Sequence, residues 1–206
     1  MRALLLIGGG GHCRSCIDVI ETGGAFGVSG VVLPPGSRAT EVLGYPVLGT
    51  DDDLQELISR LGNALVAIGQ VKSPEPRVRA WESLVAYGAT IPTVVSPLAH
   101  VSRHADVGVG TIVMHRGVVN ARGIVGRNCI INSFALVEHD VVVGDHCHVA
   151  TGAILNGGVH VGDGSFVGSG AVVREGVRIG QRVVIGAGQV VLRDVPSDMV
   201  IRADTK

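Results

Sequence analysis

The chain has 206 residues, which suffices for one large or two small domains with a buried core. Its 17 basic and 18 acidic residues give a formal net charge of −1, and no basic stretch stands out, so nucleic acid is not an expected partner. The opening apolar run, residues 3–7, is too short for a signal-peptide core or a membrane span, so we expect a cytoplasmic protein with no membrane partner.

The first part of the chain, residues 1–90, alternates between strand-like and helix-like segments. The apolar runs and helical spacings predict strands at residues 3–7, 28–33 and 65–68 and helices at residues 13–21, 51–60 and 75–87. Asp51 or Asp52 could cap the second of these helices. The alternation predicts an α/β, Rossmann-like domain, in which helices cover a small parallel sheet.

A glycine-rich turn, residues 8–11, follows the first predicted strand and is followed by His12. Cys13 stands where the third glycine of a G-x-G-x-x-G dinucleotide motif belongs. Pro34 and Pro35 stand where an acidic residue would close the second strand. A dinucleotide is therefore disfavoured, whereas a single nucleotide diphosphate at the turn and the helix N-terminus remains reasonable.

From Val95 onward an aliphatic residue recurs at every sixth position. All seventeen are branched: Val95, Val101, Val107, Val113, Val119, Val125, Ile131, Val137, Val143, Val149, Leu155, Val161, Val167, Val173, Ile179, Ile185 and Val191. The next residue is often Gly or Asn, which predicts positive φ there. An unbroken hexad predicts a parallel β-helix with the aliphatics stacked inside, so residues 91–206 should form an all-β domain.

The cysteines favour packing roles. Cys13 and Cys16 form a C-x-x-C pair without a second pair, which is weak evidence for a metal or redox site. Cys129 and Cys147 are eighteen residues apart at predicted inward positions. We expect these two to be stacked thiols of the core.

The hexad pattern resembles the hexapeptide-repeat acyltransferases. The resemblance implies a left-handed β-helix with three hexads per coil, a homotrimer, and acetyl-CoA as co-substrate. One face of a lone prism would also leave valines and alanines near solvent, which favours a trimer that binds acetyl-CoA between neighbouring prisms.

One histidine of the repeats is flanked by carboxylates. His139 lies between Glu138 and Asp140, and a carboxylate beside an imidazole fixes its tautomer and raises its basicity, as a general base requires. Gly157, eighteen residues later, should stack on the next coil. A glycine there would let a thioester approach the backbone, and its N–H could hold an oxyanion.

Almost the whole chain resembles a narrower family. The glycine turn ending in His12 and the Val-Glu-His-Asp segment around His139 are similar to those of the nucleotide-sugar and sialic-acid acetyltransferases, which include the bacillosamine-pathway and perosamine N-acetyltransferases. The resemblance implies N-acetylation of a nucleotide-linked amino sugar, with His139 as base and Asn132 nearby. The residues implied to bind the nucleotide are Gly10, Gly11 and His12. The residues implied to bind acetyl-CoA are His148, Gly157, Ser169 and Ala187.

Three alternatives stay open. A γ-type carbonic anhydrase uses the same solenoid with a three-histidine zinc site, which His139, His146 and His148 could supply, but it has no use for the glycine turn, so no metal is expected. The carboxylate-flanked histidine argues against a non-enzymatic scaffold. An O-acetyltransferase acting on a sugar hydroxyl fits the residues as well as an N-acetyltransferase does.

Overall fold

The computed structural model describes residues 1–202; the last four residues of the predicted second domain, 203–206, lie outside the described residues. The N-terminal part contains β1 (Arg2–Ile7), α1 (Gly11–Gly23), β2 (Phe26–Leu33), β3 (Glu41–Val42), β4 (Tyr45–Thr50), the 3-10 helix η1 (Asp51–Asp53), α2 (Leu54–Leu61), β5 (Ala64–Val66) and α3 (Glu75–Ala86). None of the described helices is long and apolar enough to cross a membrane.

The N-terminal sheet has the strand order β3-β4-β2-β1-β5. All neighbouring strands pair in parallel except β3 and β4, which are antiparallel. Helix α1 packs on one face of the sheet, and α2 and α3 cover the other. The predicted α/β class is confirmed, together with the three strands and three helices of the prediction.

Two features of the N-terminal part differ from the prediction. The edge strands β3 and β4 were not expected. The expected cap at Asp51 or Asp52 is wrong, because Thr50 is the N-cap of η1 and the Asp53 carboxylate accepts the Thr50 N–H at 2.7 Å. Thr50 and Asp53 together form a capping box, which satisfies the first free N–H groups of the turn.

Residues beyond α3 form a left-handed parallel β-helix. Its strands are β6 (Val94–Val95), β7 (His100–Val101), β8 (Asp106–Val107), β9 (Ile112–Val113), β10 (Val118–Val119), β11 (Ile124–Val125), β12 (Ile130–Ile131), β13 (Leu136–Val137), β14 (Val142–Val143), β15 (His148–Val149), β16 (Ile154–Leu155), β17 (His160–Val161), β18 (Phe166–Val167), β19 (Val172–Val173), β20 (Arg178–Ile179), β21 (Val184–Ile185), β22 (Val190–Val191) and β23 (Val200–Ile201). Each of the seventeen hexad aliphatics is the second residue of one of the strands β6 to β22, as the pattern predicts.

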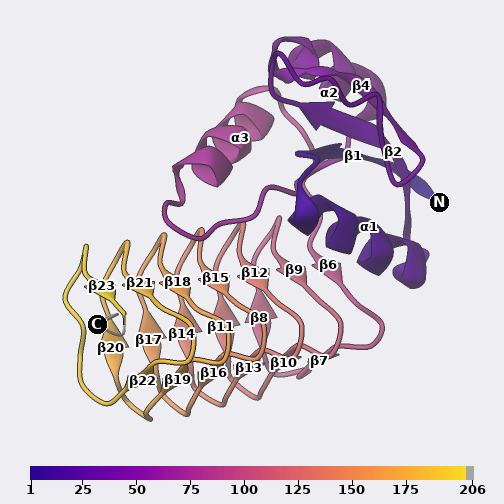
Figure 1. Cartoon of the computed structure of the whole chain (residues 1–206). Coiled ribbons are helices and arrows are strands. Elements are labelled where there is room, and N and C mark those ends of the chain that lie inside the picture. Colours follow the sequence, from indigo (N-terminus) through magenta and orange to yellow (C-terminus); the bar gives the residue numbers. More distant parts are fainter. Residues whose placement is uncertain (203–206) are drawn as a thin grey trace.

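The strands form three parallel sheets, one for each side of the prism. The first, β6-β9-β12-β15-β18-β21-β23, lies beneath the N-terminal domain (Figure 1), and we name it the covered sheet. The second, β7-β10-β13-β16-β19-β22, has mostly aliphatic outward side chains, and we name it the apolar sheet. The strands β8-β11-β14-β17-β20 form the third sheet. Partners in each sheet are eighteen residues apart, as Val119 and Val137 are.

The solenoid interior is a stack of aliphatic and small side chains. The predicted inward residues from Val113 to Val191 belong to one buried cluster. Cys129 and Cys147 lie in it as free thiols, and the Cys147 N–H donates to Cys129 Sγ at 3.4 Å, so the expected stacking is confirmed. Cys13 and Cys16 are also buried and free.

The glycines that follow the hexad aliphatics are not there for positive φ, contrary to the prediction. Positive φ occurs three residues after each aliphatic from Val107 to Ile185, for example at Gly110, Arg116 and Asp140, and not at the next residue. Where the next residue is glycine, an added side chain would approach the following coil too closely. A Cβ on Gly162 would lie 2.6 Å from the carbonyl carbon of Gly180. Glycine is therefore needed there because the backbones of adjacent coils approach closely.

We predict that Gly162→Ala lowers the free energy of unfolding by about 1–3 kcal/mol, because the added methyl overpacks a backbone contact. A urea titration measures the loss. Gly23→Ala is the control, because its nearest new contact, Pro97 Cδ at 3.9 Å, is an ordinary one. Equal stability of the Gly162 variant and the parent would show that coil spacing does not depend on this glycine.

Candidate functional site

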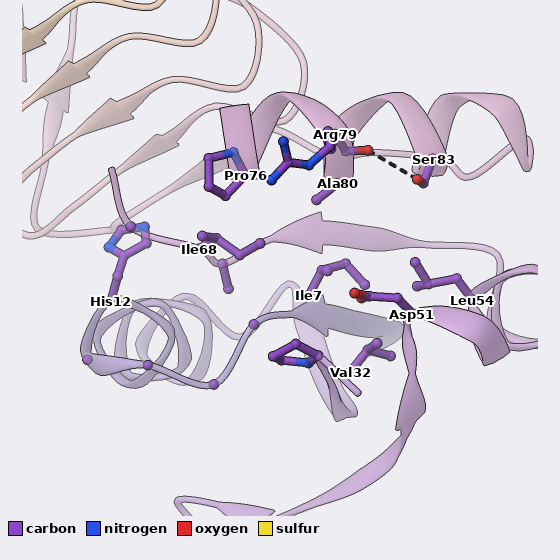
Figure 2. A pocket seen from close by; sticks show the side chains of 17 residues that line it. Ile7, His12, Val32, Asp51, Leu54, Ile68, Pro76, Arg79, Ala80 and Ser83 are labelled. Carbon is purple, nitrogen blue, oxygen red and sulfur yellow. Dashed lines mark hydrogen bonds between the residues drawn. The ribbon is translucent and has the colours of Figure 1, made fainter. Parts of the chain in front are cut away.

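A cavity of about 710 Å³ opens at the carboxyl ends of β1, β2 and β5 (Figure 2). Helix α1 begins at this edge, and α3 forms the opposite wall. The lining residues are Ile7, Gly8, Gly9, Gly10, Gly11, His12, Val32, Pro34, Asp51, Leu54, Ala67, Ile68, Gly69, Pro76, Arg79, Ala80 and Ser83. The predicted group Gly10, Gly11 and His12 therefore lies in a cavity.

The glycine turn is open toward this cavity. A Cβ on Gly10 or Gly11 would meet nothing within 4 Å, and no side chain caps the start of α1 at Gly10. The first N–H groups of a helix carry a partial positive charge and suit an anion. Gly9 has a packing role instead, because a Cβ there would lie 2.3 Å from Leu33 Cδ2.

Two charged residues of the cavity were missed in the sequence. Arg79 comes from α3 and Asp51 from the turn after β4, and both point toward the cavity in Figure 2. Partial burial and the neighbouring Asp52 raise the pKa of Asp51. The helical period could have indicated that Arg79 and Arg77 point in different directions, because residues two apart lie on different faces of a helix. Arg77 is buried, and Arg79 faces the cavity.

His148 lies on the covered sheet, beneath the N-terminal domain, and is buried. Its Nδ1 is 2.6 Å from the carbonyl oxygen of Gln70, so Nδ1 carries the proton and donates. Its Nε2 accepts from Asn132 Nδ2 at 3.1 Å. The His12 ring lies 6.3 Å away, centroid to centroid. Burial and the charge of Arg77 lower the pKa of His148 to about 4, although the bond to Gln70 acts in the opposite direction.

Arg77 connects the two domains and was also missed. Its fully buried guanidinium donates to the carbonyl oxygens of Val66 and Ile68, and at 2.8 Å to both the backbone oxygen and Oδ1 of Asn128. The Asn128 amide donates back to the Arg77 carbonyl at 3.3 Å. This reciprocal contact fixes the cavity loop that follows β5 against the solenoid.

His139 lies at a different corner of the prism and is 63% exposed. Its Nδ1 is 2.9 Å from Asp140 Oδ2, whereas the Glu138 carboxylate binds Asn120 Nδ2 at 2.9 Å. The bond to His139 and the charge of Arg122 lower the pKa of Asp140. Of the two flanking carboxylates, Asp140 is therefore the one that holds the ring.

Gly157 stacks against His139 on the next coil, as the eighteen-residue spacing predicts. A Cβ on Gly157 would lie 2.6 Å from His139 Cε1 and 2.8 Å from Nε2. Only glycine leaves room for the imidazole in this position. No hydrogen bond to the Gly157 N–H is found within residues 1–202.

The predicted acetyl-transfer residues fall into two groups. His139, Asp140 and Gly157 lie at the corner between the apolar and third sheets. His148 belongs to the covered sheet, and Asn132, Ser169 and Ala187 lie at the corner between the covered and apolar sheets. The corner at His139 is opposite the covered sheet, so one copy of the chain does not bring the two groups together.

The three histidines of the zinc alternative are equally dispersed. His146 lies at the corner between the third and covered sheets, where its Nδ1 accepts from Asn128 Nδ2 at 2.9 Å. His139 and His148 lie at the places already described. Within the described part of the chain no group of three His, Cys, Asp or Glu side chains could hold a metal ion.

The lowered pKa of His148 predicts a pH dependence of stability. Between pH 6.5 and about 4 the unfolded chain binds a proton at His148 that the folded protein excludes, so stability falls as the pH decreases through this window. His148→Gln should reduce the slope by up to about 1.4 kcal/mol per pH unit. Urea titrations at several pH values measure the slope. An unchanged slope would mean that the folded protein protonates His148 normally.

Comparison with known proteins gives two family matches. Residues 3–79 match the PglD N-terminal domain, and residues 158–192 match the bacterial transferase hexapeptide repeat. Among curated protein sequences, none matches the chain significantly.

Solved structures match nearly the whole chain. A variant of perosamine N-acetyltransferase from Caulobacter crescentus, in complex with CoA and GDP-perosamine, is 35% identical with a TM-score of 0.90, over 99% of this chain and 95% of that chain. The acetyltransferase domain of PglB from Neisseria gonorrhoeae is 31% identical with a TM-score of 0.89, over 97% and 96% of the two chains. WeeI from Acinetobacter baumannii, at 22% identity and a TM-score of 0.84, shares the fold.

The glycine-turn domain, the hexad solenoid and these full-length similarities lead to one identification. The chain belongs to the hexapeptide-repeat acyltransferases that carry a PglD N-terminal domain, in the family of the nucleotide-sugar acetyltransferases.

Proposed function

We propose that this acyltransferase moves the acetyl group of acetyl-CoA to the amino group of a nucleotide-linked sugar. The observation that carries the proposal is the open cavity at the glycine turn, on a chain 35% identical to an enzyme bound to CoA and GDP-perosamine. We assign residues 1–90 to nucleotide-sugar binding and residues 91–206 to acetyl transfer.

The nucleotide occupies the cavity. Its diphosphate lies at the N–H groups of Gly10 and Gly11, where the start of α1 favours negative charge. Arg79, on the opposite wall, supplies a guanidinium that pairs with phosphate oxygens. The apolar end of the cavity at Val32 and Pro34 receives the base, so the sugar extends past His12 toward His148.

The acetyl-transfer site forms between copies of the chain in a homotrimer. The first residue of each strand points outward, and on the apolar sheet these residues include Val118, Leu136, Ile154, Val172 and Val190. Val190 is 64% exposed in the single chain. An aliphatic face of this extent on a flat sheet is typical of an interface between copies. A threefold arrangement with the apolar sheets toward the axis buries it.

That arrangement completes the site. The apolar sheet is bounded on one side by the corner with Ser169 and Ala187 and on the other by the corner with His139. Around a threefold axis, the first corner of one copy meets the second corner of its neighbour. His139 of the partner subunit therefore joins Asn132 and His148 of this chain.

The CoA arm follows the first of these corners. Ser169 and Ala187 are eighteen residues apart on successive coils, and both side chains are small. On the later coils the positive-φ residues of the same corner are Gly152, Gly170 and Gly188, and a Cβ on any of them would meet nothing within 4 Å. The backbone is consequently accessible to the amide groups of pantetheine along the corner.

Transfer proceeds by direct attack. The neutral sugar amine attacks the thioester carbonyl, the C–N bond forms, and the Gly157 N–H stabilises the oxyanion. Asp140 holds Nδ1 of His139, which leaves Nε2 free to take the proton from the nitrogen. Collapse of the tetrahedral intermediate breaks the C–S bond, and the proton passes to the CoA thiolate. Asn132 and His148 hold each other in place through their hydrogen bond, and together they position substrate groups.

We expect His139→Ala to lower kcat by about 10²–10⁴-fold, the usual effect of removing a general base. Thermal unfolding should change little, because His139 is exposed and outside the core. The assay follows CoA release with GDP- and UDP-linked amino sugars, and mass spectrometry distinguishes amide from ester products. His104→Ala, another exposed solenoid histidine, serves as the matched control. Near-normal kcat in the His139 variant would exclude the mechanism.

A further inference from the structure

The cavity histidine His12 has a hydrogen-bond partner that the proposed reaction does not use. Cys16, one turn later on α1, places its Sγ 3.4 Å from His12 Nε2. Residues four apart on a helix are neighbours on one face, so the helix itself sets this contact. Cys16 is fully buried, while His12 lines the cavity. The thiol therefore contacts the histidine from the side away from a ligand.

The direction of this hydrogen bond follows from the protonation of both groups. Burial, together with the neighbouring Cys13, raises the pKa of Cys16 well above its usual value, so Cys16 carries its proton as a thiol. Burial and the charge of Arg77 lower the pKa of His12 to about 3, so His12 is a neutral imidazole with one N–H. A thiol can donate to the lone pair of a neutral ring nitrogen. In that arrangement the His12 proton resides on Nδ1.

The surroundings of His12 leave Nδ1 for a ligand. Cys16 is the one hydrogen-bond partner of the His12 side chain found within residues 1–202. His148 lies at 6.3 Å between ring centroids, which is a ring contact. Gly69 packs against the histidine from the other side, where an added Cβ would lie 3.3 Å from His12 Cβ. The ring is thus held between α1 and the loop after β5.

We propose that Cys16 is a positioning residue that selects the tautomer of His12. Its thiol donates to Nε2 and keeps the proton on Nδ1, and the Nδ1–H donates to a phosphate oxygen of the nucleotide in the cavity. The identity of that ligand rests on the proposed function, whereas the tautomer does not. The second cysteine of the C-x-x-C motif thereby has a role that is neither redox nor metal binding.

The tautomer can be measured without any substrate. Long-range ¹H–¹⁵N correlation spectra of protein labelled at histidine nitrogen, recorded at pH 7.5, identify which ring nitrogen is protonated. The full-length protein should show His12 as the Nδ1–H form. Cys16→Ala should shift His12 toward the Nε2–H form, and Cys16→Ser, which restores a donor, should recover most of the Nδ1–H form. Cys13→Ala is the matched control, a buried cysteine of the same helix that should leave the spectrum of His12 unchanged.

The kinetic consequence is confined to one substrate. Cys16→Ala should raise KM for the nucleotide amino sugar by about 2- to 10-fold, the effect of weakening one hydrogen bond, and leave KM for acetyl-CoA unchanged. Cys16→Ser should reverse the rise, and Cys13→Ala should show none.

Two results of the spectra would overturn the inference: an Nε2–H tautomer in the parent protein, or an Nδ1–H tautomer that persists in Cys16→Ala. An equal rise of KM in Cys13→Ala and Cys16→Ala would also overturn it, because a packing defect in α1 would then be the cause. If the parent protein acetylates no nucleotide amino sugar, the proposed function fails, and the spectra still decide the role of Cys16.

Discussion

The parallel pairing of each residue with the one eighteen positions later is the interaction on which the rest of the structure depends. It sets Val119 against Val137 in the sheet, Cys129 against Cys147 in the core and His139 against Gly157 at a corner. The close approach of the coils leaves no space for side chains at positions such as Gly162. A site built on this ladder is rigid, because each functional side chain is fixed by paired backbone above and below it.

The N-terminal domain is joined to the ladder by buried polar contacts as well as by apolar packing. Arg77 binds Asn128, and Gln70 binds both His148 and the Gly164 carbonyl. Through these contacts the loop that lines the cavity also holds a histidine of the solenoid. The proposed nucleotide cavity and the proposed acetyl-transfer residues of the covered sheet are consequently held in a fixed arrangement, although they come from different domains.

The sequence predicted each solenoid strand from β6 to β22, because the hexad leaves one choice of inward residue, but it did not predict β23, which lies outside the register of the hexads. It missed β4, where Pro46 and Gly49 interrupt the strand pattern, and it assigned the turn glycines to the wrong cause, since spacing does not reveal backbone contacts between coils. The sequence also placed His139 and His148 at one acetyl-transfer site without showing that a single chain keeps them apart. Nine residues are half of an eighteen-residue coil, so these side chains lie on opposite sides of the prism. Arg77 and Cys16 act through contacts that only the folded chain displays.

In the proposed trimer, each acetyl-transfer site takes His139 from one copy and the nucleotide cavity with His148 from another. Subunit mixing tests this sharing of the site. Equal amounts of His139→Ala and of the double variant Gly11→Val/His148→Ala, each nearly inactive alone, are dissociated in denaturant and reassembled together. Activity should return to about one quarter of that of the parent protein, because a random trimer pairs two intact halves at about one site in four. Mixed trimers that form and remain as inactive as the separate variants would contradict it.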